Sequence, residues 1–149
     1  MPRWEFSAKL DPVRTAIAAG RDLRVSYKDA VELLAVIRGK KLEEAKRMLE
    51  DVIEMRRPIP YRRFYGKVGH RRGMGPGRYP VKAARAVLKV LESAEANAEY
   101  KGLDTSRLWV IHAAAHKGPK IRGYMPRAFG RATAWFEQLV HVEIGLEER

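Results

Sequence analysis

The clearest indication of the fold of this chain of 149 residues lies in residues 108–144, LWVIHAAAHKGPKIRGYMPRAFGRATAWFEQLVHVEI. Apolar and other side chains alternate at its two ends, Leu108–Ala115 and Leu139–Ile144, and this period of two predicts β-strands. A Gly-Pro pair at Gly118 and Pro119 opens a turn between them. Two strands around a turn predict a β-hairpin.

The middle of this hairpin is unsuited to a core. Its flanks, Ala113–Lys117 and Arg127–Thr133, are small or basic and could not bury a face. We therefore expect the hairpin to project from the body as an extended arm over about 113–133. Apolar side chains exposed on such an arm imply a partner that covers them. These side chains are Ile121, Tyr124, Met125 and Phe129.

Helical patterns lie upstream of the hairpin. The first begins after Ser26, a good N-cap, and stops at Gly39. The second covers Leu42–Glu54 and the third Pro80–Tyr100, each with apolar residues at three- and four-residue spacing. A further strand is expected over Val13–Ala18. The fold class is therefore α+β, with three helices packed on a small antiparallel three-stranded sheet, in a single domain over residues 1–149.

A long basic loop separates the second and third helices. Residues 56–79 contain three Pro, five Gly and no apolar periodicity, which predicts an irregular insertion. A structureless loop of this length is unusual unless it is functional or disordered. Aromatic residues interleave with its arginines, and this composition suits stacking on bases and gripping phosphates.

Positive charge is concentrated in two segments that contain no acid. The chain has 30 Lys plus Arg and 18 Asp plus Glu; eleven bases lie in Met55–Leu91 and six in Thr105–Phe136. The remaining residues carry a net charge of −5. Segregated like charge indicates a polyanionic partner. The candidate contact residues are Arg56, Arg57, Arg62, Arg63, Lys67, Arg71, Arg72, Arg78, Lys82, Arg85, Arg107, Lys117, Lys120, Arg122, Arg127, Arg131, Tyr61, Phe64, Tyr65 and Phe129.

Composition also excludes several classes of protein. Without cysteine there is no disulfide framework, thiolate metal site or thiol catalysis. No apolar run approaches the ~20 residues that span a bilayer, and the first ten residues, MPRWEFSAKL, lack the apolar centre of a signal peptide. We expect a soluble intracellular protein.

No motif indicates catalysis, a metal or a cofactor. His112 and His116 have the spacing of a helical metal site, but on a strand they stand ~13 Å apart, and no carboxylate is expected nearby. GMGPG at residues 73–77 lacks phosphate-loop spacing. RGYMPRAF at residues 122–129 matches four positions of the RNA-recognition-motif signature, but Pro126 excludes a central strand. We therefore expect no enzyme, no metal and no cofactor.

Three runs of sequence resemble a known family. RGKK at 38–41, VLKVLESAEANAEYKGLD at 87–104 and HKGPKIRGYMPRAFGRA at 116–132 are similar to the universal large-subunit ribosomal protein family numbered twenty-two. The resemblance extends over about residues 15–148. The extension before about Val13 and the loop 56–79 resemble the archaeal and eukaryotic branch. A single Asn, a single Gln and 19 Arg are typical of a heat-adapted source.

The resemblance implies a structural role in the large ribosomal subunit. Its expected partners are large-subunit ribosomal RNA, contacted across several of its domains, neighbouring ribosomal proteins and the nascent polypeptide. The globular part is expected near the exit of the nascent-peptide tunnel and the hairpin along its wall, with a role in subunit assembly. By the same resemblance the tip that faces the nascent chain comprises Lys120, Ile121, Arg122, Gly123, Tyr124 and Met125.

Two other functions stay open from the residues alone. A DNA-binding or chromatin-type module also uses basic charge, although no helix-turn-helix is apparent and the bases lie in loop and hairpin. An RNA-modifying enzyme would need a cofactor pocket. Competition between structured ribosomal RNA and duplex DNA distinguishes a ribosomal RNA-binding protein from a DNA-binding module. A small cofactor bound to the purified protein would support the RNA-modifying enzyme.

Overall fold

The three expected helices are present in the computed structural model, which describes residues 5–149: α1 (Tyr27–Ile37), α2 (Leu42–Ile53) and α3 (Val81–Tyr100). The Ser26 hydroxyl accepts a hydrogen bond from the N–H of Asp29 and caps α1. Gly39, with a φ of 84°, adopts the left-handed conformation that lets the chain leave this helix. The predicted boundaries of the three helices are confirmed to within a residue or two.

The expected antiparallel sheet is also confirmed, with longer strands than predicted. It contains β1 (Thr15–Leu23), β8 (Glu137–Glu148) and β5 (Leu108–Ile121) in the order β1-β8-β5. Pairing of β5 with β8 continues to Ile121 opposite Glu137, beyond the end of the apolar alternation. Backbone hydrogen bonds sustain this outer pairing, so hydropathy alone underestimates the strand length.

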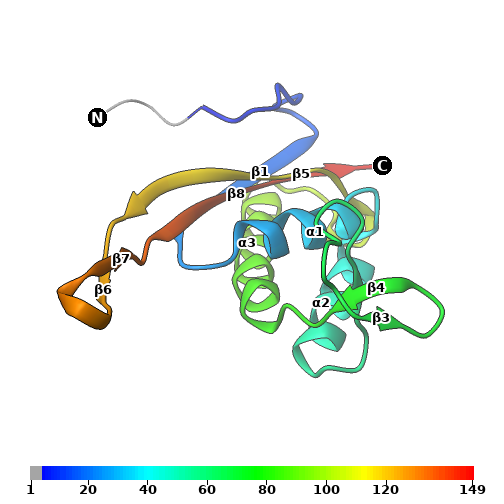
Figure 1. Ribbon diagram of the computed structural model, residues 1–149. Helices are drawn as coiled ribbons and strands as arrows, with labels where there is room; N and C mark the ends of the chain where they lie inside the picture. The colour runs from blue at the N-terminus through cyan, green and yellow to red at the C-terminus, as the bar shows by residue number, and fades with distance from the viewer. Residues whose placement is uncertain (1–4) are drawn as a thin grey trace.

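The helices cover one face of this sheet (Figure 1). On β8 the inward positions Val140 and Val142 are buried, and the alternation continues to Leu146. On β5 an irregularity in the register between Val110 and His112 moves the inward positions from even to odd numbers, so that Val110 and Ala113 both reach the core. The sequence pattern alone did not reveal this bulge.

A segment before β1 crosses the opposite face of the sheet. The N–H and hydroxyl of Ser7 both donate to Oε2 of Glu143, at 3.1 and 2.6 Å. Leu10 packs against Gly145, where an added Cβ would approach within 2.5 Å of its Cδ1. The N-terminal extension therefore buries the centre of a sheet face that the helices leave open.

The loop between α2 and α3 is more regular than predicted. It contains β2 (Ile59–Pro60), β3 (His70–Arg71) and β4 (Gly75–Arg78), paired in the order β2-β4-β3. The prediction of an irregular loop was wrong because strands of two to four residues are too short to display a period of two. The β3 and β4 strands form a small protrusion on one side of the body (Figure 1).

The long hairpin leaves the body on the other side, and its projecting part begins later than expected. Ala113 is buried in the core and Ala115 packs partly against it, so the arm starts near Gly118 instead of residue 113. The first strand of the hairpin, β5, pairs with β8 and not with Arg127–Thr133, so that Lys117 lies opposite Val140. The tip contains β6 (Tyr124–Pro126), the short 3-10 helix Ala128–Gly130 and β7 (Ala132–Ala134).

A 3-10 turn at Thr105–Arg107 connects α3 to β5. None of the helices in the described part of the chain is long and apolar enough to cross a membrane.

Candidate nucleic-acid interface

A hollow of about 860 Å³ lies where the base of the long hairpin meets the start of α1. We call it the basic bay. Five chain segments supply its walls: the end of β1 with the start of α1, the loop after β2, the start of α3, the end of β5 and the start of β8. It is lined by Arg24, Val25, Ser26, Tyr27, Lys28, Arg63, Phe64, Lys82, Lys117, Lys120, Phe136, Glu137 and Gln138.

Positive charge dominates the basic bay. Six of its lining side chains are cationic, and Glu137 is the one acid among the described residues that line it. Oε1 of Glu137 lies 3.7 Å from Nε of Arg24, so part of the negative charge of Glu137 is offset by this arginine. Six cations that converge on one hollow repel one another, and an anion placed between them relieves that repulsion. The bay therefore suits a phosphate backbone.

Aromatic rings lie among these cations. Tyr27 and Phe64 meet edge to face, with ring centroids 6.3 Å apart. The Lys117 ammonium lies 5.3 Å from the centre of the Tyr27 ring, and Lys120 lies 5.9 Å from that of Phe136. A ring face attracts a cation through its quadrupole, so these contacts help to hold the two lysines in place. Rings and cations together provide the stacking and phosphate contacts that single-stranded nucleic acid requires.

A buried carboxylate holds the arginine loop against α1. Glu32 is 3% exposed and accepts hydrogen bonds from the backbone N–H groups of Arg62, Arg63 and Phe64 at 3.1, 2.7 and 2.6 Å. Three donors around one carboxylate compensate for its burial. These bonds fix the backbone from which the exposed side chains of Arg62 and Arg63 extend.

Tyr61 reinforces the same attachment and is not free to stack on a base. Its side chain is 3% exposed and its hydroxyl donates to Oδ1 of Asp29 at 2.6 Å. Burial, followed by this hydrogen bond, raises the pKa of Tyr61 well above its ordinary value. The Arg78 guanidinium lies 5.8 Å from its ring. The expected base contact at Tyr61 is therefore replaced by a structural contact, whereas Phe64 is half-buried and Tyr65 is exposed.

The predicted basic residues are all exposed, but they occupy several separate places. Arg63, Lys82, Lys117 and Lys120 line the bay, and Arg85 lines a shallower hollow beside it that shares Arg24 and Lys82. Arg56 pairs with Glu54 at 2.6 Å just after α2. Arg57 and Arg62 line a separate groove. On the β3-β4 protrusion and its connections lie Lys67, Arg71, Arg72 and Arg78.

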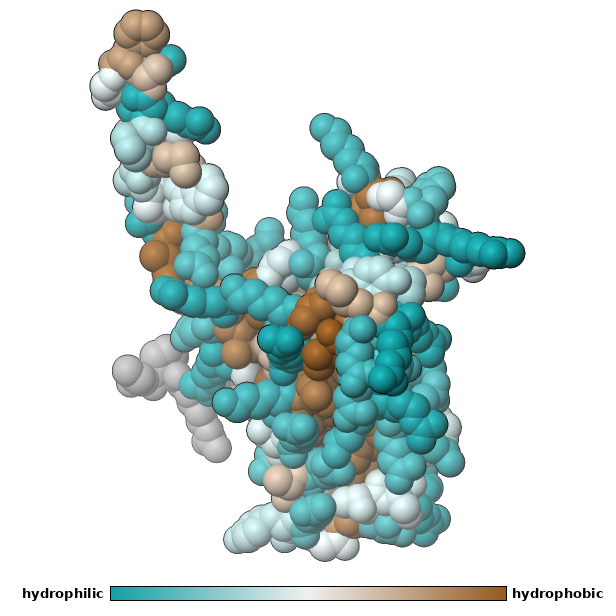
Figure 2. All heavy atoms as spheres, turned by 90° about the horizontal axis from the view of Figure 1, so that it is seen from below, coloured by the Kyte–Doolittle hydropathy of each residue, from teal (hydrophilic) through white to brown (hydrophobic). Residues whose placement is uncertain are grey.

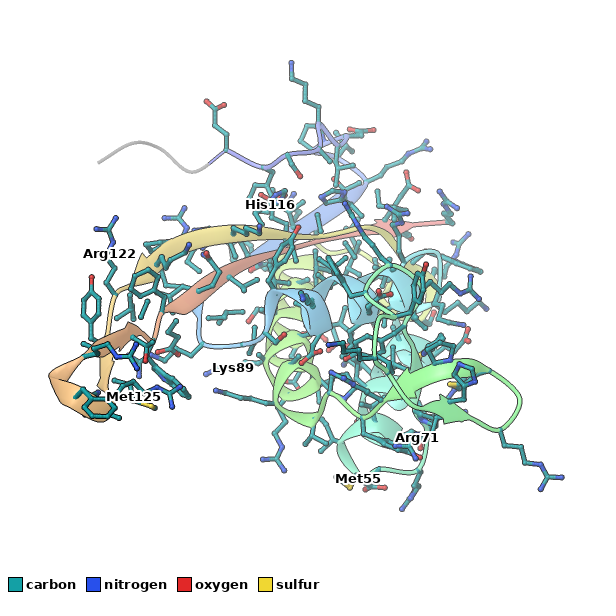
Figure 3. All side chains as sticks on the ribbon, in the orientation of Figure 1. Met55, Arg71, Lys89, His116, Arg122 and Met125 are labelled. Atoms are coloured by element: carbon teal, nitrogen blue, oxygen red, sulfur yellow. The ribbon has the colours of Figure 1, made fainter. Side chains whose placement is uncertain are left out.

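The two protrusions point away from each other. Figure 3 shows Arg71 on the β3-β4 side and Arg122 on the long hairpin, at opposite sides of the body. Arg107 lies elsewhere again: it precedes β5, whose 14 residues extend ~45 Å, and it shares a shallow site with Lys41 and Trp109. A polyanion that touches all these groups must wrap around the protein.

The hairpin tip combines exposed aromatic side chains with arginines. Phe129 is 97% exposed, and Tyr124 and Trp135 are also exposed. The ring of Tyr124 meets that of Phe136 with centroids 5.9 Å apart, which braces the arm. Figure 2 shows hydrophobic residues at the end of an otherwise mainly hydrophilic arm. The cations of the tip, all exposed, are Arg122, Arg127 and Arg131.

Four cationic or aromatic residues of the bay were not predicted from the sequence: Arg24, Tyr27, Lys28 and Phe136. Arg24 and Lys28 have Asp22 and Asp29 as sequence neighbours, so they fall outside the acid-free segments. Only their position beside the hairpin base reveals them. The order of charges along the chain contained no signal for this convergence.

His112 and His116 lie on β5, as expected, but the expectation that no carboxylate is near them was wrong. Nε2 of each histidine lies 3.4 Å from Oε2 of Glu143 on the neighbouring strand. Burial acts to raise the pKa of Glu143, but hydrogen bonds from Ser7 and His112 and the charge of His116 outweigh it and lower that pKa. Within residues 5–149, no group of three or more His, Asp or Glu side chains is arranged to hold a metal ion.

Comparison with known proteins gives consistent matches over nearly the full length. The family model described as "Ribosomal protein L22p/L17e" matches residues 18–147. A relative from Thermofilum pendens named "Large ribosomal subunit protein uL22" is 57% identical, covering 97% of this chain and 96% of its own. Relatives with the same name from Archaeoglobus fulgidus and Methanocaldococcus jannaschii are 56% and 52% identical. They cover 93% and 99% of this chain and 92% and 97% of their own chains.

Proposed function

The chain belongs to the ribosomal protein L22p/L17e family, and we propose that it binds large-subunit ribosomal RNA through the basic bay, the β3-β4 protrusion and the long hairpin. It is a protein of the large ribosomal subunit, from a structural family and not an enzyme family. The observation that carries the proposal is the bay, where six cations and three aromatic rings converge from five chain segments.

Phosphate neutralisation supplies most of the affinity in this proposal. Lysine and arginine side chains that contact phosphates release condensed counterions, which favours binding with little choice of sequence. Selectivity then comes from the shape of folded RNA, because the cations lie on several separate parts of the surface. Rings such as Phe64 and Tyr65 stack on bases that are not paired.

The long hairpin extends this interface away from the body. Its exposed tip residues, Phe129 above all, require a covering surface, and folded RNA with the nascent polypeptide supplies one. In keeping with the family resemblance, we propose that the arm lines the wall of the nascent-peptide tunnel, that the body lies near its exit, and that the chain supports assembly of the subunit. The protein then acts in the cytoplasm as part of the ribosome, beside neighbouring ribosomal proteins.

The test is a salt titration of binding to fragments of large-subunit ribosomal RNA, with duplex DNA as competitor. We expect affinity to fall steeply as salt rises, and structured RNA to outcompete DNA. Lys117→Gln in the bay should reduce the log–log salt slope by about one. Arg47→Gln, which removes one exposed charge from α2 outside the acid-free segments, serves as the matched control. A flat salt dependence, or equal loss in both variants, would contradict the proposal.

A further inference from the structure

We infer that a second cavity, next to the basic bay, binds one unpaired RNA nucleotide, with the base inside and its phosphate at the mouth. This inference rests on the proposed RNA-binding function and specifies the form of RNA recognised. The cavity, called the nucleotide groove below, lies between α1, the loop around β2 and the middle of β5, and measures about 680 Å³. This size falls within the ~300–1,000 Å³ typical of pockets for small ligands.

Apolar side chains make up most of the lining of the nucleotide groove, and four of them are alanines. Val31 and Ala35 contribute from α1, Ile59 from β2, and Ala113–Ala115 from β5. Short alanine side chains leave room for a planar ring to approach the backbone, while Met48, which also lines the groove, can adjust to its edge. An apolar slot of this kind suits the face of a nucleobase.

The mouth of the groove is cationic. Arg38, Arg57, Arg62 and Arg63 all line it and are all exposed. Glu32 is the one acid among the described lining residues, and its carboxylate is already occupied by three backbone N–H groups. A purely apolar ligand would leave the four arginines without an anionic partner. An apolar planar group joined to an anion satisfies both parts of the groove, and a nucleotide has this composition.

The groove and the bay adjoin each other. Tyr27 and Arg63 line both cavities, so a strand whose phosphates lie in the bay reaches the groove at the next nucleotides. The base that enters must be unpaired, because paired bases in an RNA helix are not free to leave the stack. The position of Arg63 at this junction depends on Glu32, which accepts from its backbone N–H.

A cavity-filling substitution tests the inference without a change in charge. Ala35 is an exposed residue of α1 that lines the groove, so Ala35→Phe fills it with a ring. Ala96→Phe makes the same change at an exposed position of α3 and is the control. The probes are a fluorescein-labelled RNA hexamer of adenosine nucleotides and the same hexamer lacking its bases. Circular dichroism verifies that each variant is folded.

We expect the unmodified protein to bind the hexamer with bases roughly tenfold more tightly than the abasic one. Ala35→Phe should abolish most of this preference and leave the salt slope unchanged, whereas Ala96→Phe should retain both. A preference retained in Ala35→Phe overturns the inference, because the base then stacks elsewhere, for example on Phe64. Unchanged hexamer binding combined with lost incorporation into subunits also overturns it, and assigns the groove to a neighbouring protein.

Cross-linking gives a second measurement that does not depend on the variants. An RNA hexamer with one 4-thiouridine is irradiated on the unmodified protein, and the linked peptide is identified by mass spectrometry. Linkage within residues 31–38 or 57–63 supports the inference, and linkage confined to the hairpin contradicts it. If equal binding of the two hexamers accompanies normal binding to ribosomal RNA, the groove is refuted while the proposed function stands. Failure to bind either kind of RNA refutes the proposed function itself.

Discussion

Replacing Glu32 with glutamine tests whether one buried carboxylate positions the arginine loop. The carboxylate accepts three backbone hydrogen bonds, two at Oε1 from Arg63 and Phe64 and one at Oε2 from Arg62. Glutamine retains one oxygen and turns an NH₂ group toward the donors, so at least one amide loses its acceptor. Because an unsatisfied buried donor costs about 1–3 kcal/mol, we expect the free energy of unfolding to fall by about 2 kcal/mol.

The effect of Glu32→Gln on RNA binding distinguishes a positioning role of Glu32 from a simple effect of its charge. Removal of a negative charge from a cationic surface should by itself strengthen RNA binding. If Glu32 acts by holding Arg62 and Arg63 in place, Glu32→Gln should instead weaken binding several-fold. The assays are urea denaturation followed by circular dichroism, hydrogen exchange of the three amides, and RNA binding at fixed salt.

Glu50→Gln is the matched control for Glu32→Gln, because Glu50 is an exposed residue of α2 and the substitution removes the same charge. We expect unchanged stability and unchanged amide exchange at residues 62–64 in this control. The reasoning is refuted if Glu32→Gln behaves like Glu50→Gln in stability and exchange, or if it strengthens RNA binding as charge alone predicts.

Three further outcomes follow from the geometry. The lowered pKa of Glu143 stabilises the fold above its ordinary value near 4.5, and this contribution is lost as the pH falls through the lowered pKa. In urea titrations Glu143→Gln should therefore lose less stability on acidification than the unmodified chain. The raised pKa of Tyr61 stabilises the fold fully below its ordinary value of 10.0, and this is lost as the pH rises through the raised pKa. Tyr61→Phe should lessen that alkaline loss, and ultraviolet titration should detect one late-ionising tyrosine fewer. Replacing residues 122–136 with Asn-Gly closes the pair Ile121–Glu137 by a two-residue turn and should preserve folding. The variant loses Phe136 from the bay and three arginines of the tip, but all six cations of the bay remain, so we expect it still to be incorporated into sedimenting subunits. Loss of incorporation by a folded variant would show that the tip contributes to docking.

The fold was largely predictable because local signals and tertiary structure agree in the helices. Ser26 caps α1 and Gly39 ends it in the conformations that the sequence indicated. The sheet was harder to predict from the sequence. The bulge between Val110 and His112 changes which residues face inward, and no residue type at these positions indicates it. The short strands of the loop depend on pairing across residues 59–78, and such pairing is a property of the folded chain.

The positions of the acidic residues along the chain explain why the candidate interface was predicted only in part. Acid-free segments located most of the cations, since a stretch without carboxylates identifies where a polyanion can approach. They could not locate Arg24 and Lys28, which join the bay despite neighbouring acids. Nor could they indicate Glu32, an acid outside both segments that fixes the backbone between Arg62 and Phe64. In the proposed interface the bases supply the attraction for RNA, but their geometry depends on the buried carboxylate of Glu32, because its two oxygens hold three loop amides at one point.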